Sequence, residues 1–423
     1  MKVDLVIHNI GQLITCRCDG KPKRGSAMRD IGLIENGAIA ISEGKIVAVG
    51  KSDEILSQYL FDTDIDAAGK VACPGFVEPH THIVFAGDRL NEFELKIKGA
   101  DYLEILENGG GIISTVRQTR VASLQNLVEL SKARLDKMLA CGTTTAEIKT
   151  GYGLDLETEM KMLAVIEELD KAHAIDIVPT FLAAHAVPPE FKENSNGYVD
   201  LICNTMMQRA WKWFVSSRFY GKTPFFADIF CEKNAFSAEQ LRKVLETARS
   251  LGFKLKAHVD EFTNLGGSRI AIGLGATSIE HLDAISDDEI GLLAKSSTVA
   301  VVTPTVNFNF GSDKFADARK LIDSGCIVAL STDYNPGSAP CPSQPMAMAI
   351  ACRYQKLLPC EAINAATINA AYAIGLGDKV GSIEVGKRAD ILIFDATDYR
   401  QIAYEFGDNH PSDIIKNGIR ISR

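Results

Sequence analysis

Between residues 71 and 379, short apolar runs alternate with longer segments in which apolar residues recur every three or four positions. The short runs are rich in Val, Ile, Ala and Thr, with little alternation of apolar and polar positions. This is typical of parallel strands that are covered on both faces, whereas the longer segments have the spacing of helices with one buried face. We expect strands at residues 71–78, 143–149, 175–184, 227–231, 254–260, 277–281, 298–303 and 326–332.

The segments between these strands carry signals of helix ends. Ser237-Ala-Glu-Gln240 is a capping box that opens a helix running to Gly252. The segment 117–141 has helical spacing and stops before Gly142, a residue type that often follows a helix. Further helices are expected at residues 157–171, 312–324, 343–357 and 360–374.

Eight strands with helices between them predict an α/β fold, a (β/α)8 TIM-like barrel. A doubly wound sheet is the alternative, but it needs a glycine-rich phosphate loop after an early strand, and the sequence has no convincing one. Both chain ends are instead β-rich: residues 3–10 alternate, and residues 39–49 resemble two strands joined at Glu43-Gly44. We expect a small β-sandwich domain from residues 1–70 and 380–423, and a barrel domain from residues 71–379.

The composition narrows the class of protein. The chain has 423 residues, of which 46% are hydrophobic and 23% charged, which matches a globular enzyme. Its net charge is −9 and it has no block of Lys and Arg, so we expect no nucleic-acid partner. No apolar run reaches the roughly 18 residues of a membrane span, so no membrane partner is expected. The alternating N-terminus and ten scattered cysteines without a C-x-x-C pair predict a cytoplasmic protein with reduced thiols.

Histidines gather at one end of the predicted barrel. Of eight in the chain, five fall at the carboxyl ends of predicted strands, and an aspartate ends the last strand. Barrel enzymes place their chemistry at that rim, so packing alone is a poor explanation for the set. These residues are His80, His82, His185, His258, His281 and Asp333.

The pattern predicts one divalent metal. His80 and His82 are two positions apart on an extended segment, so both imidazoles point to the same side. With His258 and Asp333 they supply three nitrogens and one oxygen, a set that suits zinc or iron. A bound metal lowers the pKa of a coordinated water towards about 7, and Asp333 is placed to accept its proton. His281 is either a further ligand or an acid/base group near the metal.

A second metal is the less favoured variant. Lys149 ends the strand Thr144-Thr-Ala-Glu-Ile-Lys149, where a carbamylated lysine would bridge two metals. An ion pair is the simpler interpretation, because no further carboxylate or His is clearly available. Glu78, two residues before His80, either supports a ligand or is an ordinary charge at a strand end.

These motifs resemble the amidohydrolase superfamily over nearly the whole chain. The resemblance is carried by Pro74-Gly-Phe-Val-Glu-Pro-His-Thr-His82, His258, His281, Ser331-Thr-Asp333 and Gly381-Ser-Ile-Glu-Val-Gly-Lys-Arg-Ala-Asp390. The segments Glu147-Ile-Lys-Thr-Gly-Tyr-Gly153 and Phe181-Leu-Ala-Ala-His-Ala-Val187 narrow it to the branch that acts in histidine breakdown. That branch implies hydrolysis of the cyclic amide 4-imidazolone-5-propanoate to N-formimidoyl-L-glutamate.

The resemblance also assigns roles to residues. Arg89 would grip the carboxylate of a small anionic heterocycle as a fork, and Tyr152 would add a hydroxyl donor. His185 would donate a hydrogen bond to the ring carbonyl, while Glu261 would hold the ring nitrogens or orient water. Asp333, His281, Glu261 and His185 are the expected catalytic residues, and Asn335, Gly337 and Ser338 would line the far wall of the substrate site.

Two departures and two rival functions accompany this resemblance. Ser338 stands where relatives often have Thr, and residues 205–226 are longer and more aromatic than expected. The first rival is another cyclic amidohydrolase or an aminohydrolase such as a purine deaminase, which would keep the four ligands without needing Arg89 and Tyr152. The second is a metal-free scaffold protein on the same barrel. The resemblance further implies a homodimer.

Overall fold

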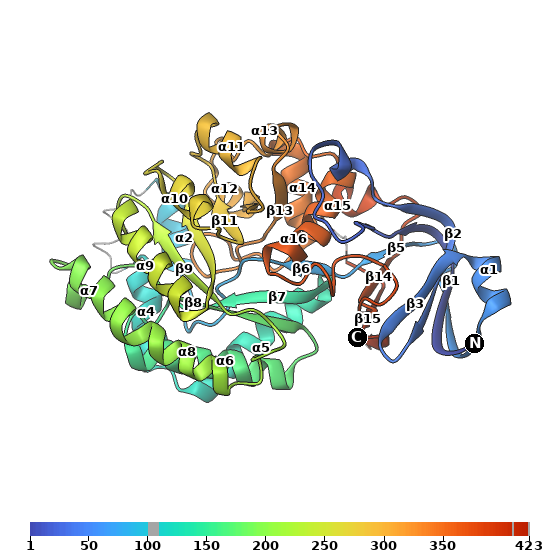
Figure 1. The fold of residues 1–423 in the computed structure, drawn as a ribbon, viewed down its shortest axis with the longest axis horizontal. Coiled ribbons are helices and arrows are strands. Elements are labelled where there is room, and N and C mark those ends of the chain that lie inside the picture. The colour runs from blue at the N-terminus through green and yellow to red at the C-terminus, as the bar shows by residue number, and fades with distance from the viewer. Residues whose placement is uncertain (100–109, 408–409, 422–423) are drawn as a thin grey trace.

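The computed structural model describes residues 1–99, 110–407 and 410–421. A barrel forms the larger part, and a sheet that contains both chain ends lies beside it (Figure 1). The predicted fold class is therefore confirmed. Among the described residues, no helix is long and apolar enough to cross a membrane.

The barrel consists of eight parallel strands in sequential order. Every predicted strand is present, with one change: residues 71–78 form two strands, of which only the second belongs to the barrel. Gly75 separates them, and Val71–Pro74 pairs with the sheet of the chain ends. The barrel strands are β6 (Phe76–Glu78), β7 (Thr143–Lys149), β8 (Asp176–Ala184), β9 (Phe226–Cys231), β10 (Lys254–Val259), β11 (Ser278–His281), β12 (Val299–Val302) and β13 (Ile327–Leu330).

Most of the helices pack around the barrel, as the apolar spacing predicted (Figure 1). They are α2 (Leu90–Ile97), α4 (Ile112–Val121), α5 (Leu124–Ala140), α6 (Leu156–Ala172), α7 (Ser195–Leu201), α8 (Met207–Ser216), α9 (Ala238–Leu251), α10 (Gly267–Gly273), α11 (Asp287–Leu293), α12 (Pro304–Asn309), α13 (Ala318–Asp323), α14 (Gln344–Tyr354), α15 (Pro359–Ala366), α16 (Ile368–Ala373) and α17 (Gln401–Tyr404).

Three predicted helices differ from the observed ones. The expected helix 117–141 is interrupted, because the Ser123 hydroxyl accepts a hydrogen bond from the Asn126 N–H and starts a new helix. Thr367, with φ −125° and ψ −93°, divides the expected helix 360–374. Of the expected helix 312–324, only Ala318–Asp323 is helical. The capping box at Ser237 is present as predicted.

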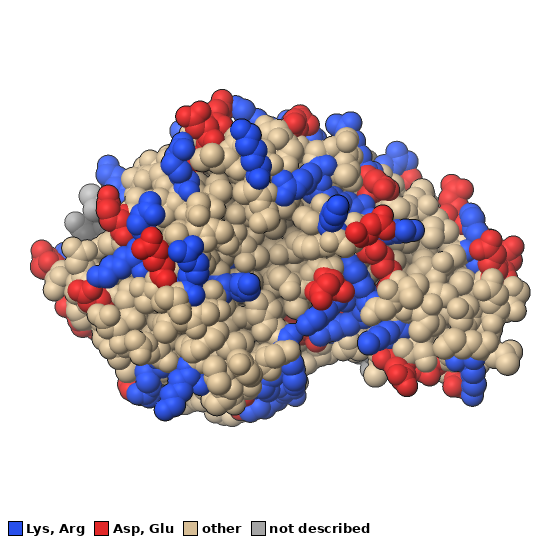
Figure 2. All heavy atoms as spheres, viewed as in Figure 1, with Lys and Arg blue, Asp and Glu red and all other residues tan. Residues whose placement is uncertain are grey.

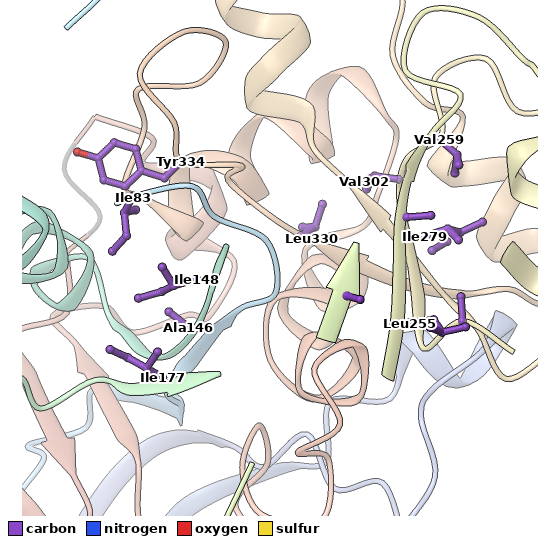
Figure 3. Close-up of a cluster of buried hydrophobic side chains, with 14 of the residues drawn as sticks. Ile83, Ala146, Ile148, Ile177, Leu255, Val259, Ile279, Val302, Leu330 and Tyr334 are labelled. Carbon is purple, nitrogen blue, oxygen red and sulfur yellow. The ribbon is translucent and has the colours of Figure 1, made fainter. Parts of the chain in front are cut away.

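Residues on each strand alternate between two environments. On β7, Ala146 and Ile148 face the helices and join a large apolar core, part of which Figure 3 shows. Glu147 and Lys149 alternate with them and are also fully buried. At the other end of the barrel, α16 packs against apolar residues of β12 and β13. The carboxyl end of the barrel is therefore the polar end.

The chain ends form one hydrogen-bonded sheet, in which β1 pairs with β2, β4 and β5. Glu43 and Gly44 have positive φ and connect β2 to β3, as expected of that pair. We propose residues 1–70 and 380–423 as a domain distinct from the barrel. The sheet also includes β5 (Val71–Pro74), which lies just beyond these bounds. Its strands are β1 (Lys2–Ile14), β2 (Leu33–Ser42), β3 (Lys45–Lys51), β4 (Leu60–Asp66), β5, β14 (Ile391–Phe394), β15 (Asp413–Lys416) and β16 (Ile419–Ile421), with helix α1 (Ser52–Gln58).

The aromatic segment packs within the chain. Phe214 on α8 stacks on Phe225 at a centroid distance of 4.8 Å, and Trp211 lies 5.1 Å from Phe253. These contacts fix α8 against the barrel and account for the aromatic composition. Figure 2 shows acidic and basic side chains interspersed over one face of the molecule.

Candidate metal centre

Four predicted ligands meet at the carboxyl end of the barrel. Nε2 of His82 lies 3.2 Å from Nε2 of His80 and 3.3 Å from Nε2 of His258. Oδ1 of Asp333 lies 3.4 Å from Nε2 of both His80 and His82. His80 and His82 follow β6, His258 lies within β10, and Asp333 follows β13. Each of the four residues is at most 3% exposed.

This geometry fits a metal ion. Metal–nitrogen bonds of about 2.0–2.1 Å in a tetrahedral site place neighbouring ligand atoms roughly 3.4 Å apart. Asp333 Oδ1 is buried and has no hydrogen-bond partner among the residues described. A bare carboxylate oxygen facing imidazole nitrogens needs a cation between them. The donor set therefore fits a divalent metal.

Burial shifts the pKa of every ligand in the direction that favours the neutral form of the side chain. The pKa values of His80, His82 and His258 lie well below the usual range, because burial disfavours the imidazolium ion and nearby cations add to the effect. Burial raises the pKa of Asp333 well above its ordinary value. Neutral imidazoles keep the lone pairs that a metal requires, and a bound cation would favour the ionised carboxylate.

His281 lies beside the ligands, and with His80 and Asp333 it forms a group whose donor atoms all lie within 4.8 Å of one another. Its ring is 5.2 Å from His258 and 5.5 Å from His80, centroid to centroid. Nδ1 of His281 is 3.1 Å from the Thr303 hydroxyl, and Nε2 lies 3.9 Å from Oε2 of Glu261. Burial lowers the pKa of His281 to about 4, so the ring is neutral at pH 7. Burial and the nearby Asp333 raise the pKa of Glu261 well above its ordinary value.

His185 stacks on His82 with a centroid distance of 4.8 Å. Its Nδ1 is 3.0 Å from the Gly151 carbonyl, which can only accept a hydrogen bond, so Nδ1 carries the proton. Burial lowers the pKa of His185 to about 4, so the ring is neutral and Nε2 is an acceptor. This tautomer leaves no proton on Nε2, so it conflicts with the predicted role of His185 as a donor to the ring carbonyl. The Gly151 contact that fixes the tautomer cannot be read from the sequence alone.

Of the predicted substrate residues, Tyr152 lies beside this cluster, and Arg89, Asn335 and Gly337 share a cavity. The Tyr152 ring lies 5.3 Å from His185 and 6.1 Å from His82. Nε of Arg89 donates to Glu92 at 2.7 Å and Nη2 donates to the same carboxylate, so part of the fork is already engaged. A side chain at Gly337 would collide with Nη1 of Arg89. Arg89, Asn335 and Gly337 line a cavity of about 390 Å³.

Asn335 and Ser338 mainly shape the loop after β13. The Asn335 amide donates to the Asp333 carbonyl and to the Ser338 hydroxyl, both at 2.7 Å. Its Oδ1 accepts from the N–H groups of Gly337 and Ser338 at 2.8 Å. These contacts hold Asp333, whose φ of +48° is strained for a residue with a side chain.

The ion-pair interpretation of Lys149 agrees with the structure. Nζ of Lys149 lies 2.8 Å from both Glu147 and Asp228. Asp228, His258 and Glu280 form another group that could hold a metal, but Lys256 also pairs with Glu280 at 2.9 Å. Two ammonium groups therefore already neutralise the carboxylates of that group.

Glu78 closes the barrel between its first and last strands. Its carboxylate accepts from the Ser331 and Thr332 hydroxyls at 2.5 and 2.7 Å, and from the Gln344 amide at 2.9 Å. Burial raises the pKa of Glu78 to about 7, while these donors act in the opposite direction. Glu78 therefore supports the segment that leads from β13 to the ligand Asp333.

Sequence reasoning missed several polar residues below the ligands. Asp228, Lys256, Glu280 and Thr303 are all at most 2% exposed. A signal was available, because Lys256 is two positions before His258 on one strand and so shares its face. Charged residues within strands that are otherwise apolar also indicate this group of buried polar residues.

This fold and this site define a metal-dependent hydrolase of the barrel type, and comparison with known proteins identifies the family. The family model described as "Amidohydrolase family" matches residues 71–420, so the chain belongs to the amidohydrolase family. Within it the chain is 51% identical to the imidazolonepropionase of Chloroflexus aggregans, over 98% of this chain and 97% of that one. It is 48% identical to the imidazolonepropionase of Herpetosiphon aurantiacus, over 99% and 97% of the two chains.

A solved structure shows the same fold. An adenosine deaminase from Xanthomonas campestris with bound zinc superposes with a TM-score of 0.71, covering 99% of this chain and 93% of that chain. The two sequences are 20% identical, so this likeness bears on the fold alone.

Proposed function

We propose that this chain hydrolyses the cyclic amide of 4-imidazolone-5-propanoate to N-formimidoyl-L-glutamate, a step of histidine degradation. The observation that carries the proposal is the 51% identity over 98% of the chain to a relative named imidazolonepropionase. The site supports it, because it contains a cluster of imidazoles and one carboxylate, and the loop that follows Asp333 lines a cavity together with Arg89.

The metal is proposed to be a single zinc or divalent iron ion held by His80, His82, His258 and Asp333. Three imidazole nitrogens and one carboxylate oxygen suit both ions. When bound, the ion supplies Lewis-acid chemistry, polarising a carbonyl and making water a stronger acid.

Asp333 is proposed to move the proton between water and the departing ring nitrogen. Its Oδ1 lies 3.4 Å from Nε2 of both His80 and His82, so the carboxylate is placed to accept a proton from a water held among these ligands. His281 lies alongside, with Nε2 buried and lacking a hydrogen-bond partner in the described structure. We assign it to hydrogen-bond the attacking water or Asp333, with its ring oriented by Thr303.

The remaining residues are proposed to orient the substrate. Arg89 presents Nη1 to the substrate carboxylate while Glu92 holds its other edge, and Tyr152 donates from its hydroxyl. His185, whose Nε2 accepts, takes a hydrogen bond from a ring N–H instead of donating one to the carbonyl. Glu261 faces a ring nitrogen, and Asn335, Gly337 and Ser338 form the far wall.

We further propose a cytoplasmic homodimer. All ten cysteines are free, which is typical of a reducing compartment. The dimer rests on the resemblance to the family.

The test is a comparison of two substrates with the purified, metal-loaded chain. We expect loss of the ultraviolet absorbance of fresh 4-imidazolone-5-propanoate and no release of ammonia from adenine or guanine. A chain that deaminates a purine and leaves the imidazolone intact would contradict the proposal in favour of the deaminase alternative.

A further inference from the structure

A chain of buried polar contacts connects the metal ligand His258 to Lys149. Asp228 lies between them: its Oδ1 and Oδ2 are 3.1 and 3.0 Å from Nδ1 of His258. Nζ of Lys149 is 2.8 Å from Oδ2 of Asp228 and 2.8 Å from Oε1 of Glu147. The three members come from β10, β9 and β7, so this contact chain crosses the inside of the barrel.

The contact with Asp228 fixes both the tautomer and the orientation of His258. A carboxylate only accepts, so Nδ1 of His258 carries the proton and the lone pair lies on Nε2. Nε2 is the atom that faces His82, at 3.3 Å. A carboxylate on the outer nitrogen also makes a ligating imidazole more basic.

His258 differs in this respect from the other two histidine ligands. The Nδ1 atoms of His80 and His82 have no hydrogen-bond partner among the residues described. The carboxylate paired with Nδ1 of His80 belongs to Glu280 and is 3.9 Å away, beyond hydrogen-bond distance. Of the three histidine ligands, His258 is therefore the one whose orientation a carboxylate fixes directly.

Lys149 holds Asp228 in the position that this contact requires. Asp228 and Glu147 are 1% and 0% exposed, and two carboxylates this deep in a barrel need a shared cation. The ammonium group of Lys149 is that cation. The Ile229 N–H, 2.7 Å from Oδ1, fixes the carboxylate from the other side.

We infer that Asp228 and Lys149 are positioning residues for the metal ligand His258, with Asp228 orienting the imidazole and Lys149 orienting Asp228. The inference rests on the proposed function only in that the site holds a metal. It makes no claim about the substrate.

The test compares metal affinity among full-length variants. Apparent dissociation constants for Zn²⁺ are measured by chelator competition, and the visible absorption spectrum of the Co²⁺-loaded protein reports ligand geometry. The variants are Asp228→Ala, Asp228→Asn and Lys149→Met. Lys256→Met is the matched control, because Lys256 is a second fully buried lysine whose contacts are Pro79, Ser278 and Glu280, none of them a ligand.

We expect Asp228→Ala and Lys149→Met to weaken Zn²⁺ binding by about 10- to 100-fold and to alter the Co²⁺ spectrum. Asp228→Asn should lose less, because its amide oxygen still accepts from Nδ1. Lys256→Met should stay within about two-fold of the native chain. Native-like affinity and spectrum in Asp228→Ala, or equal losses in both lysine variants, would overturn the inference.

Two further comparisons keep the test decisive. If Asp228→Ala does not fold, the comparison of Lys149→Met with Lys256→Met decides, and equal Zn²⁺ affinities in these two variants would contradict the inference. Failure of the proposed function shows separately, as a native chain that binds Zn²⁺ tightly but leaves the imidazolone intact.

Discussion

At the scale of single residues, the site combines neutral histidines with strained backbone. His281 has φ +78° and Leu282 φ +72°, both in the left-handed region that side chains other than glycine rarely adopt. Such strain is kept where the surrounding structure determines the conformation, and it is common at functional sites. Here it turns the His281 ring towards the metal ligands.

Replacing Arg89 by Met tests the substrate-binding role at this scale. Hydrogen bonds to charged groups contribute about 1.5–3 kcal/mol, so KM for the imidazolone should rise about 10- to 100-fold with a smaller change in kcat. Steady-state kinetics measure both constants. Arg117→Met, at an exposed position on α4, is the control and should leave KM unchanged. An unchanged KM in Arg89→Met would favour a substrate without a carboxylate.

His173, which lies away from the site, should make the stability of the chain depend on pH. Burial lowers its pKa in the folded chain below the ordinary value, and the Ile175 N–H donates to Nδ1 at 3.1 Å. The unfolded chain therefore takes up this proton first, near pH 6.5, and the contribution to stability falls as pH drops below that value. His173→Asn should show a smaller loss of stability between pH 7 and pH 5 in urea unfolding. Identical pH profiles would contradict this account.

At the scale of elements, side-chain contacts and a backbone hydrogen bond close the barrel between the segments of β6 and β13. The Gln344 amide at the start of α14 donates to Glu78 at 2.9 Å and lies 3.4 and 3.3 Å from the carbonyls of Val77 and Leu330. His82 N–H donates to the Tyr334 carbonyl at 3.0 Å. These contacts set the distance between the segments that carry the His80–His82 pair and Asp333.

Gln344→Leu should destabilise the barrel, because it removes a donor from a buried carboxylate. We expect the free energy of unfolding to fall by about 1–3 kcal/mol. Denaturant unfolding measures it, with Gln208→Leu at an exposed position of α8 as the control. Equal stability in both variants would mean that Glu78 does not depend on this amide.

The strands were more predictable than the helix ends. Apolar runs such as Val299–Val302 are buried on both faces, so their composition alone reveals them. The break at Ser123 depends on one local hydrogen bond that competes with continued helical spacing. For the site, spacing placed the four ligands at one rim, whereas the His185 tautomer and the Asp228 contact depend on neighbours from other strands.

At the scale of the whole molecule, an ion cluster connects the sheet of the chain ends to the barrel. Lys416 on β15 contacts Asp390 at 2.8 Å and Asp176, the first residue of β8, at 2.5 Å. Arg388 pairs with the same Asp176. The lysine side chain is 3% exposed, so this contact is shielded from water.

Asp176→Asn should weaken the connection between the two parts. Two buried or half-buried cations then lose their shared partner, so the free energy of unfolding should fall by about 1–3 kcal/mol. Thermal unfolding followed by calorimetry measures the change. Asp62→Asn, which breaks the exposed pair with Lys2, should cost less than Asp176→Asn, because water screens that pair. A larger loss in Asp62→Asn than in Asp176→Asn would contradict this view.

One cation, held by three imidazoles and a carboxylate, is central to the proposed opening of an imidazolone ring. The most direct measurement is a titration of chelator-stripped protein with Zn²⁺ or Fe²⁺ while ring opening is followed in the ultraviolet. We predict no activity in the stripped chain and a linear rise that reaches its plateau at one metal ion per chain. Full activity without metal, or a plateau at two ions per chain, would contradict the account.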